Sequence, residues 1–155
     1  MGMDVYGKKP SSSKGEYFRN NVWWWRPLWQ YCEHVAPELT DKVQHAGSND
    51  GDGLGARDSK KLAKLLKVAI ESGDTQKYEA EYKVKLASLP QENCDICGAT
   101  GKRAVPPTVG PGDQECNGCG GKGTRAPWAA SYPFSKENVV EFCVFLEECG
   151  GFSIC

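Results

Sequence analysis

Apolar residues at helical spacing dominate the second half of the chain. One run begins near Asp58 or Ser59 and stops before Gly73, and its apolar positions fall at i, i+3, i+4, i+7 and i+8: Leu62, Leu65, Leu66, Ala69 and Ile70. Asp74 starts a second run that ends at Pro90. These patterns predict two helices, which we expect to pair as an antiparallel hairpin.

A third apolar stripe, from Val139 to Cys149, predicts the last helix. Ser135 stands where an N-cap is expected, and Gly150 and Gly151 follow the stripe. The alternation in Phe152–Ile154 is compatible with a short terminal strand.

The first third of the chain is less regular. Pro27 predicts the start of a helix from Leu28 to about Val35, and a short helix from Pro37 to about Gln44 follows it. Residues 1–14 are expected to form an extended arm, and residues 47–53 a loop. The pattern as a whole predicts one compact domain over residues 1–155 that is mainly α, or α+β at most.

Composition narrows the function classes. With 19 basic and 20 acidic side chains the net charge is -1, so the chain lacks the overall attraction to phosphate that drives unspecific nucleic-acid binding. No apolar run approaches the roughly 18 residues of a membrane span, and the first residues lack a signal-peptide core. We therefore expect a cytoplasmic protein.

Four of the eight cysteines form two C-x-x-C pairs, Cys94/Cys97 and Cys116/Cys119. Their separation is typical of a four-thiolate site for one structural Zn²⁺, whereas redox-active dithiols of the thioredoxin type need a strand before the pair and a helix after it. Many glycines and prolines interrupt this segment, which favours zinc. We expect a zinc-binding insert, a four-cysteine hairpin, over residues 91–126.

The second pair is part of the run Cys116-Asn117-Gly118-Cys119-Gly120-Gly121-Lys122-Gly123, which reads C-x-x-C-x-G-x-G. This run resembles one repeat of the cysteine-rich zinc module of J-domain chaperones. The first pair departs from the repeat, because its first glycine, Gly98, comes one position early. The chain also resembles a family of small bacterial and phage-type proteins through residues 4–7, 15–28 and 49–54. Neither resemblance implies a function.

Aromatic and polar side chains are dense in residues 17–26, where arginine and amide groups stand beside flat rings. This combination suits stacking and bidentate hydrogen bonding to a planar, nucleotide-like ligand, or contact with a partner protein. The alternative is that the rings form the core of a small helical domain. The candidate ligand-binding residues here are Tyr17, Phe18, Arg19, Asn20, Trp23, Trp24, Trp25 and Arg26.

Asn49, Asp50 and Asp52 in the glycine-rich loop are further candidate ligand-binding residues. Their oxygens could hold a divalent ion, although the spacing does not fit an EF-hand, or they could bind the backbone of their own turn. No catalytic motif is present, so we favour a non-enzymatic, zinc-containing binding protein. One alternative is an enzyme that uses this loop with His45.

A second alternative is zinc-assisted nucleic-acid binding through a basic set of side chains. That set comprises Lys60, Lys61, Lys64, Lys102 and Arg103.

Overall fold

The computed structural model describes residues 2–155 and divides them between two compact units. The first unit contains Met1–Lys83 and Tyr132–Cys155, and the second contains Val84–Ser131. The chain therefore leaves the first unit once and returns to it once. Each unit is described separately below.

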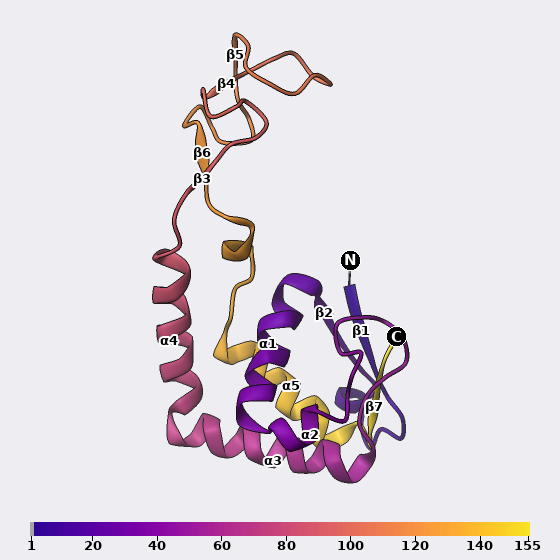
Figure 1. The fold of residues 1–155 in the computed structure, drawn as a ribbon. Coiled ribbons are helices and arrows are strands. Elements are labelled where there is room, and N and C mark those ends of the chain that lie inside the picture. The colour runs from indigo at the N-terminus through magenta and orange to yellow at the C-terminus, as the bar shows by residue number, and fades with distance from the viewer. Residues whose placement is uncertain (1) are drawn as a thin grey trace. The chain divides into compact units, whose positions relative to one another are not determined.

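The first unit is built on a three-stranded antiparallel sheet in the order β2-β1-β7 (Figure 1). The strands are β1 (Gly2–Gly7), β2 (Tyr17–Asn21) and β7 (Phe152–Ile154), and the short 3-10 helix η1 (Ser13–Gly15) lies between β1 and β2. Val5 stands opposite Phe18 on one side and Ile154 on the other. The first and last segments of the described chain are therefore neighbours in one sheet.

This sheet corrects the expectation of a mainly helical domain: the fold is a mixed α+β fold with three small sheets. Residues 2–7 form the central strand rather than a loose arm, with Met3 and Val5 fully buried. In β2, Phe18 and Asn20 are buried while Tyr17 and Arg19 are exposed. This alternation was missed because a buried asparagine reads as a surface residue; Asn20 is accommodated by donating a 2.7 Å hydrogen bond to Asn138.

The first helix, α1 (Val22–Val35), begins six residues earlier than predicted. The side chain of Asn21 accepts a 3.1 Å hydrogen bond from the Trp24 N–H and so provides the N-cap. Pro27 therefore lies inside the helix, not at its start, and the helix lacks one backbone donor there. The following helix, α2 (Pro37–Thr40), is shorter than the predicted helix, which ran to about Gln44.

The predictions for the later helices of this unit are mostly confirmed. α3 (Ala56–Ser72) ends at Gly73, which has the left-handed φ of 85° expected of a C-cap, although its N-cap is Gly55. α5 (Lys136–Glu148) is capped by Ser135 as predicted, and Phe152–Ile154 is a strand. The hairpin prediction is wrong: α3 packs against α5, and at Gly73 the chain turns into α4 (Asp74–Ala87) (Figure 1).

The hydrophobic core of the first unit lies between the helices and one face of the sheet. Trp25, Leu62, Phe142, Leu146 and Phe152 are among its fully buried side chains. Within residues 2–155, no helix is both long enough and apolar enough to cross a membrane.

The second unit contains two short antiparallel ladders and little other regular structure. β3 (Glu92–Asn93) pairs with β6 (Thr124–Arg125), and β4 (Lys102–Arg103) pairs with β5 (Gln114–Glu115). A single 3-10 turn, η2 (Trp128–Ser131), follows. Two-residue strands cannot hold such a segment in shape by themselves.

Candidate metal centre

The four cysteines of the two C-x-x-C pairs come together in the second unit. Cys94, Cys97 and Cys116 are completely buried and Cys119 is 9% exposed. All four sulfur atoms lie within 4.8 Å of one another. The Sγ–Sγ distances are 3.8 Å from Cys94 to Cys116 and 3.8 Å from Cys97 to Cys119.

These distances fit a tetrahedral metal site. A tetrahedron with metal–sulfur bonds of about 2.3 Å has sulfur–sulfur edges of about 3.8 Å. A disulfide would require about 2.05 Å between the two sulfurs, and all eight cysteines carry free thiols. The four thiolates would occupy every position of a four-coordinate ion and leave none for water or substrate, so the site is closed.

The two C-x-x-C turns are related by an approximate twofold repeat in their backbone hydrogen bonds. The Cys94 N–H donates to the Gly123 carbonyl at 2.9 Å, and the Cys116 N–H donates to the Gly101 carbonyl at 3.0 Å. The first cysteine of each turn therefore forms a backbone hydrogen bond to the glycine that ends the other turn. The ladders follow the same repeat, since one strand precedes and one follows each turn.

This repeat identifies the position at which the first pair departs from the C-x-x-C-x-G-x-G pattern. Gly121 in the second turn has a left-handed φ of 74°, and the equivalent residue in the first turn is Ala99, which adopts a φ of 63°. Ala99 is the only non-glycine residue with positive φ among the residues described. A left-handed conformation disfavours any residue with a Cβ atom, so Ala99 is strained where the second turn is not.

Nearby N–H groups favour the charged form of the sulfurs. The Gly123 N–H donates a 3.2 Å hydrogen bond to the Cys119 sulfur. Burial by itself raises the pKa of the Cys97 thiol, but hydrogen bonds from the Gly101 N–H and from the other three thiols outweigh it and lower that pKa to about 7. A thiolate, which is the form that binds metal, is therefore available near neutral pH.

The other cysteines do not join this site. Burial raises the pKa of Cys32, and also that of Cys143 to about 11, so both stay neutral thiols in the core. Within residues 2–155, the four clustered cysteines are the only group of three or more histidine, cysteine, aspartate or glutamate side chains placed to hold a metal ion. His45 and the loop around Asp52 form no such group.

The structure separates the candidate ligand-binding residues of the N-terminal region. Trp25 is fully buried, and its indole N–H donates to the Ala46 carbonyl at 2.6 Å. Phe18 and Asn20 are buried as well, whereas Tyr17 and Arg19 lie on the exposed face of the sheet, where the Tyr17 hydroxyl donates to Asp4. These side chains do not converge on one site.

Trp23 and Arg26 instead contact Tyr132, the first residue of the chain after the second unit. The Trp23 and Tyr132 ring centroids are 4.9 Å apart, and Arg26 donates a 3.0 Å hydrogen bond to the Tyr132 hydroxyl. Tyr82, close to the point where the chain leaves this unit, donates to the Tyr132 carbonyl at 2.9 Å. Through these contacts Tyr132 and Tyr82 hold together the two chain segments of the first unit that border the second unit. The sequence analysis missed them, because only their positions on either side of residues 84–131 indicate this role.

The Asn49–Asp52 loop binds its own backbone. Asp52 accepts hydrogen bonds from the His45 N–H at 2.9 Å and the Gly53 N–H at 2.7 Å, and these bonds hold its pKa below the usual range. Asn49 donates to the Gly2 carbonyl at 3.1 Å, and Asp50 accepts from the Ser48 hydroxyl. The polar groups of this loop therefore already have partners.

The five basic candidates are divided between the two units. On α3, which carries Lys60, Lys61 and Lys64, the adjacent Lys67 lies 3.8 Å from Glu147 of α5. Lys102 and Arg103 belong to the second unit, where Arg103 donates to Asn117 at 2.7 Å. No single basic face is formed from these five residues within either unit.

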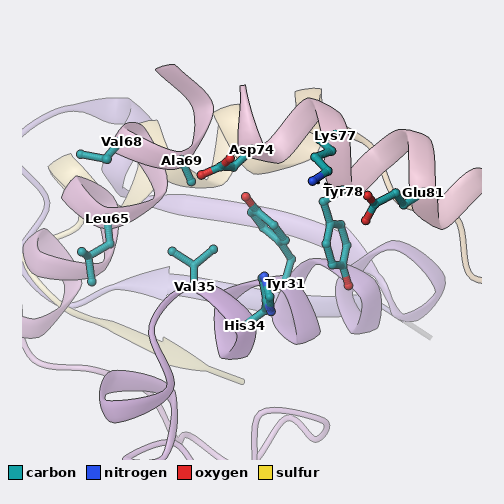
Figure 2. A pocket seen from close by; sticks show the side chains of 10 residues that line it. All are labelled: Tyr31, His34, Val35, Leu65, Val68, Ala69, Asp74, Lys77, Tyr78 and Glu81. Carbon is teal, nitrogen blue, oxygen red and sulfur yellow. Dashed lines mark ion pairs between the residues drawn. The ribbon is translucent and has the colours of Figure 1, made fainter. Parts of the chain in front are cut away.

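Several clefts in the first unit are open to solvent. One, of about 420 Å³, lies between α1, α3 and α4 and is lined by Val35, Leu65 and Tyr78 among others (Figure 2). A smaller one, of about 250 Å³, is bordered by Trp25, Arg26, Trp29, Gln30, Glu33 and Gln44. Comparisons of the chain with protein-family models, with curated proteins and with solved structures found no match.

Proposed function

We propose that this chain is a non-enzymatic zinc protein in which one Zn²⁺, held by Cys94, Cys97, Cys116 and Cys119, folds the second unit into a binding module. The observation that carries the proposal is the closed cluster of four buried sulfurs at tetrahedral spacing. A closed site has no open position for Lewis-acid chemistry, so its role is structural. Soft thiolate ligands favour zinc over hard cations such as magnesium.

Two further points support zinc and a reducing compartment such as the cytoplasm. The run Cys116–Gly123 resembles a repeat of the J-domain zinc module, and the first turn forms the same backbone hydrogen bond as the second despite Ala99. The sulfurs also lie too far apart for disulfides, which suits thiols kept reduced for metal binding.

Metal content tests this proposal directly. Purified chain should hold one zinc ion by elemental analysis, and exchange with Co²⁺ should give the absorption of a tetrahedral cobalt–thiolate centre. Cys97→Ser should remove the cobalt signal, whereas Cys155→Ser, at an exposed cysteine outside the cluster, should keep it. Folded wild-type chain with well under one zinc ion would contradict the proposal.

A second candidate function is binding of a planar, nucleotide-like ligand at the 250 Å³ cleft beside Trp25. The cleft supports it because hydrogen-bonding side chains, those of Arg26, Gln30, Glu33 and Gln44, line it together with Trp25 and Trp29. Of the residues expected to bind such a ligand, Trp25 and Arg26 border this cleft.

A panel of nucleotides should then include one that raises the melting temperature in a saturable way. Gln30→Leu should abolish that shift, whereas Gln76→Leu, at an exposed glutamine on α4, should preserve it. No shift from any member of the panel would rule out this ligand class.

A further inference from the structure

The exposed side of α3 carries an apolar centre between oppositely charged ends. Leu65 and Val68 are 36% and 56% exposed. Lys61 lies about one helical turn before Leu65, and Lys64 lies about one turn before Val68. Glu71 lies just under one turn after Val68. All three charged side chains are exposed, and none forms an ion pair within residues 2–155.

Two hollows flank this apolar centre. The 420 Å³ cleft of Figure 2 shares Val35 and Leu65 with a second cleft of about 320 Å³, which is also bordered by Leu39 and Lys61. In Figure 2, Leu65 and Val35 lie at one side of the cleft, while Asp74 and Glu81 extend from α4 along another. The two residues that these clefts share are thus aliphatic, and a protruding aliphatic side chain would pack against them.

We propose that two copies of this chain pair through this face, with their α3 helices antiparallel about a twofold axis that passes between Leu65 and Val68. In that arrangement the apolar centres meet at the axis. Along the helix Glu71 lies about 7 Å from the axis, Lys64 about 4 Å and Lys61 about 8 Å. Reversing the second helix therefore places its Glu71 between Lys61 and Lys64 of the first.

The charge order argues for a second copy rather than an unrelated ligand. A face that runs from basic through apolar to acidic complements itself only when its copy is reversed, and a twofold axis performs that reversal. The contact is small, with two exposed aliphatic residues on each copy at its centre. The dimer should therefore be weak and concentration-dependent.

Sedimentation equilibrium of the zinc-loaded chain tests the proposal. Wild type should show a reversible monomer–dimer equilibrium. Val68→Glu should abolish it, and Lys64→Glu should raise the dissociation constant about tenfold, because the change acts twice across the axis. Lys85→Glu makes the same charge change at an exposed lysine of α4 outside this face and should leave the constant unchanged.

A charge exchange provides the sharper test. Lys61→Glu and Lys64→Glu combined with Glu71→Lys should restore the wild-type dissociation constant, since each charge again faces its opposite in the second copy. All the substituted positions are exposed, so melting temperatures should stay near that of wild type, which controls for misfolding. A monomer at every concentration, a dimer insensitive to Val68→Glu, or a charge exchange that fails to restore pairing would each overturn the proposal.

Discussion

The two units differ in what holds them together. In the first unit, residues from every major element converge on one apolar core that includes Trp25, Phe142 and Leu146. In the second unit, the buried cluster consists of the four cysteines, with Ile96 packed against them. Burial of apolar surface can offset the entropy of ordering the first unit, whereas a cluster of this size cannot do so for the second.

The comparison shows how one chain combines two ways to fold. The first unit depends on the solvent and on temperature through the hydrophobic effect. The second depends on metal and on the protonation state of its ligands. A perturbation aimed at one mechanism should therefore leave the other unit largely intact, and the following predictions test that separation.

Loss of a metal ligand should have the largest effect. Cys97→Ser should unfold residues 94–124, because structural zinc sites supply on the order of 10 kcal/mol of folding free energy. Hydrogen exchange should show lost protection there and retained protection in α3 and α5. Cys155→Ser is the matched control and should change neither unit; protection that survives in Cys97→Ser would show that the second unit does not need its metal.

A cavity in the core should have the next largest effect, on the other unit. Trp25→Ala removes a fully buried ring and should lower the free energy of unfolding of the first unit by about 3–5 kcal/mol, while the zinc content stays the same. Denaturant titration followed by circular dichroism measures it. Trp128→Ala, at a residue of the second unit that is 67% exposed, should leave this transition in place. An equal loss in both variants would contradict the separation.

High pH should weaken the first unit selectively. Burial raises the pKa of Tyr31, Tyr78 and Tyr82 above the usual 10.0 in the folded chain. Below the pKa of about 10 that tyrosine has in the unfolded chain, the preference of the fold for neutral tyrosines is fully present. This stabilisation is lost as the pH rises from about 10 toward the higher pKa values of the folded chain. Each tyrosine contributes at most about 1.4 kcal/mol per pH unit in that window.

Residues 84–131 contain no tyrosine, so the second unit has no such contribution. Denaturant melts from pH about 9 to about 11, with tyrosinate absorbance recorded in parallel, provide the measurement. Tyr78→Phe should reduce the slope of stability against pH. A slope that does not change in this variant would show that Tyr78 ionises equally easily in both states.

The smallest predicted effect is a gain in the second unit. Ala99→Gly relieves the left-handed strain at the position where the first turn lacks the glycine of the C-x-x-C-x-G-x-G pattern, and it should stabilise the metal-bound form by about 1 kcal/mol. Chelator competition should report this as a zinc affinity raised roughly fivefold. Ala104→Gly serves as the control in the same unit, since Ala104 has no positive φ, and it should give no gain. Weaker zinc binding in Ala99→Gly would contradict the strain.

The metal site was the most predictable part of the molecule, because the spacing of Cys94, Cys97, Cys116 and Cys119 encodes it locally. The C-terminal end of α3 and the N-terminal end of α5 were equally predictable, because Gly73 and Ser135 cap the helices next to them in sequence. The sheet was harder: Asn20 hides the alternation of β2, and its partner Asn138 is remote in sequence. The start of α1 was misplaced because the Asn21 cap, not Pro27, determines where the helix begins.

The aromatic region shows where sequence reasoning ends. Composition identified residues 17–26 as rich in aromatic side chains but could not tell which rings are buried. Trp23, Trp24 and Trp25 have the same side chain and differ only in the direction in which it points from the helix. Tertiary packing buries Trp25 completely and leaves its two neighbours half-buried. The use of Trp23 and Arg26 to hold Tyr132 depends on a contact across more than one hundred residues.

The pairing of β1 with β7 also has a consequence for the order of events during synthesis on the ribosome. The central strand, Gly2–Gly7, is synthesised before the other described elements, and one of its two partners, Phe152–Ile154, follows some 145 residues later. Chains fold during translation from their earlier segments, and contacts between distant segments form slowly. The second unit is continuous in sequence and needs only its metal, so it can fold before β7 has been synthesised. The pairing of β1 with β7 can form only after that.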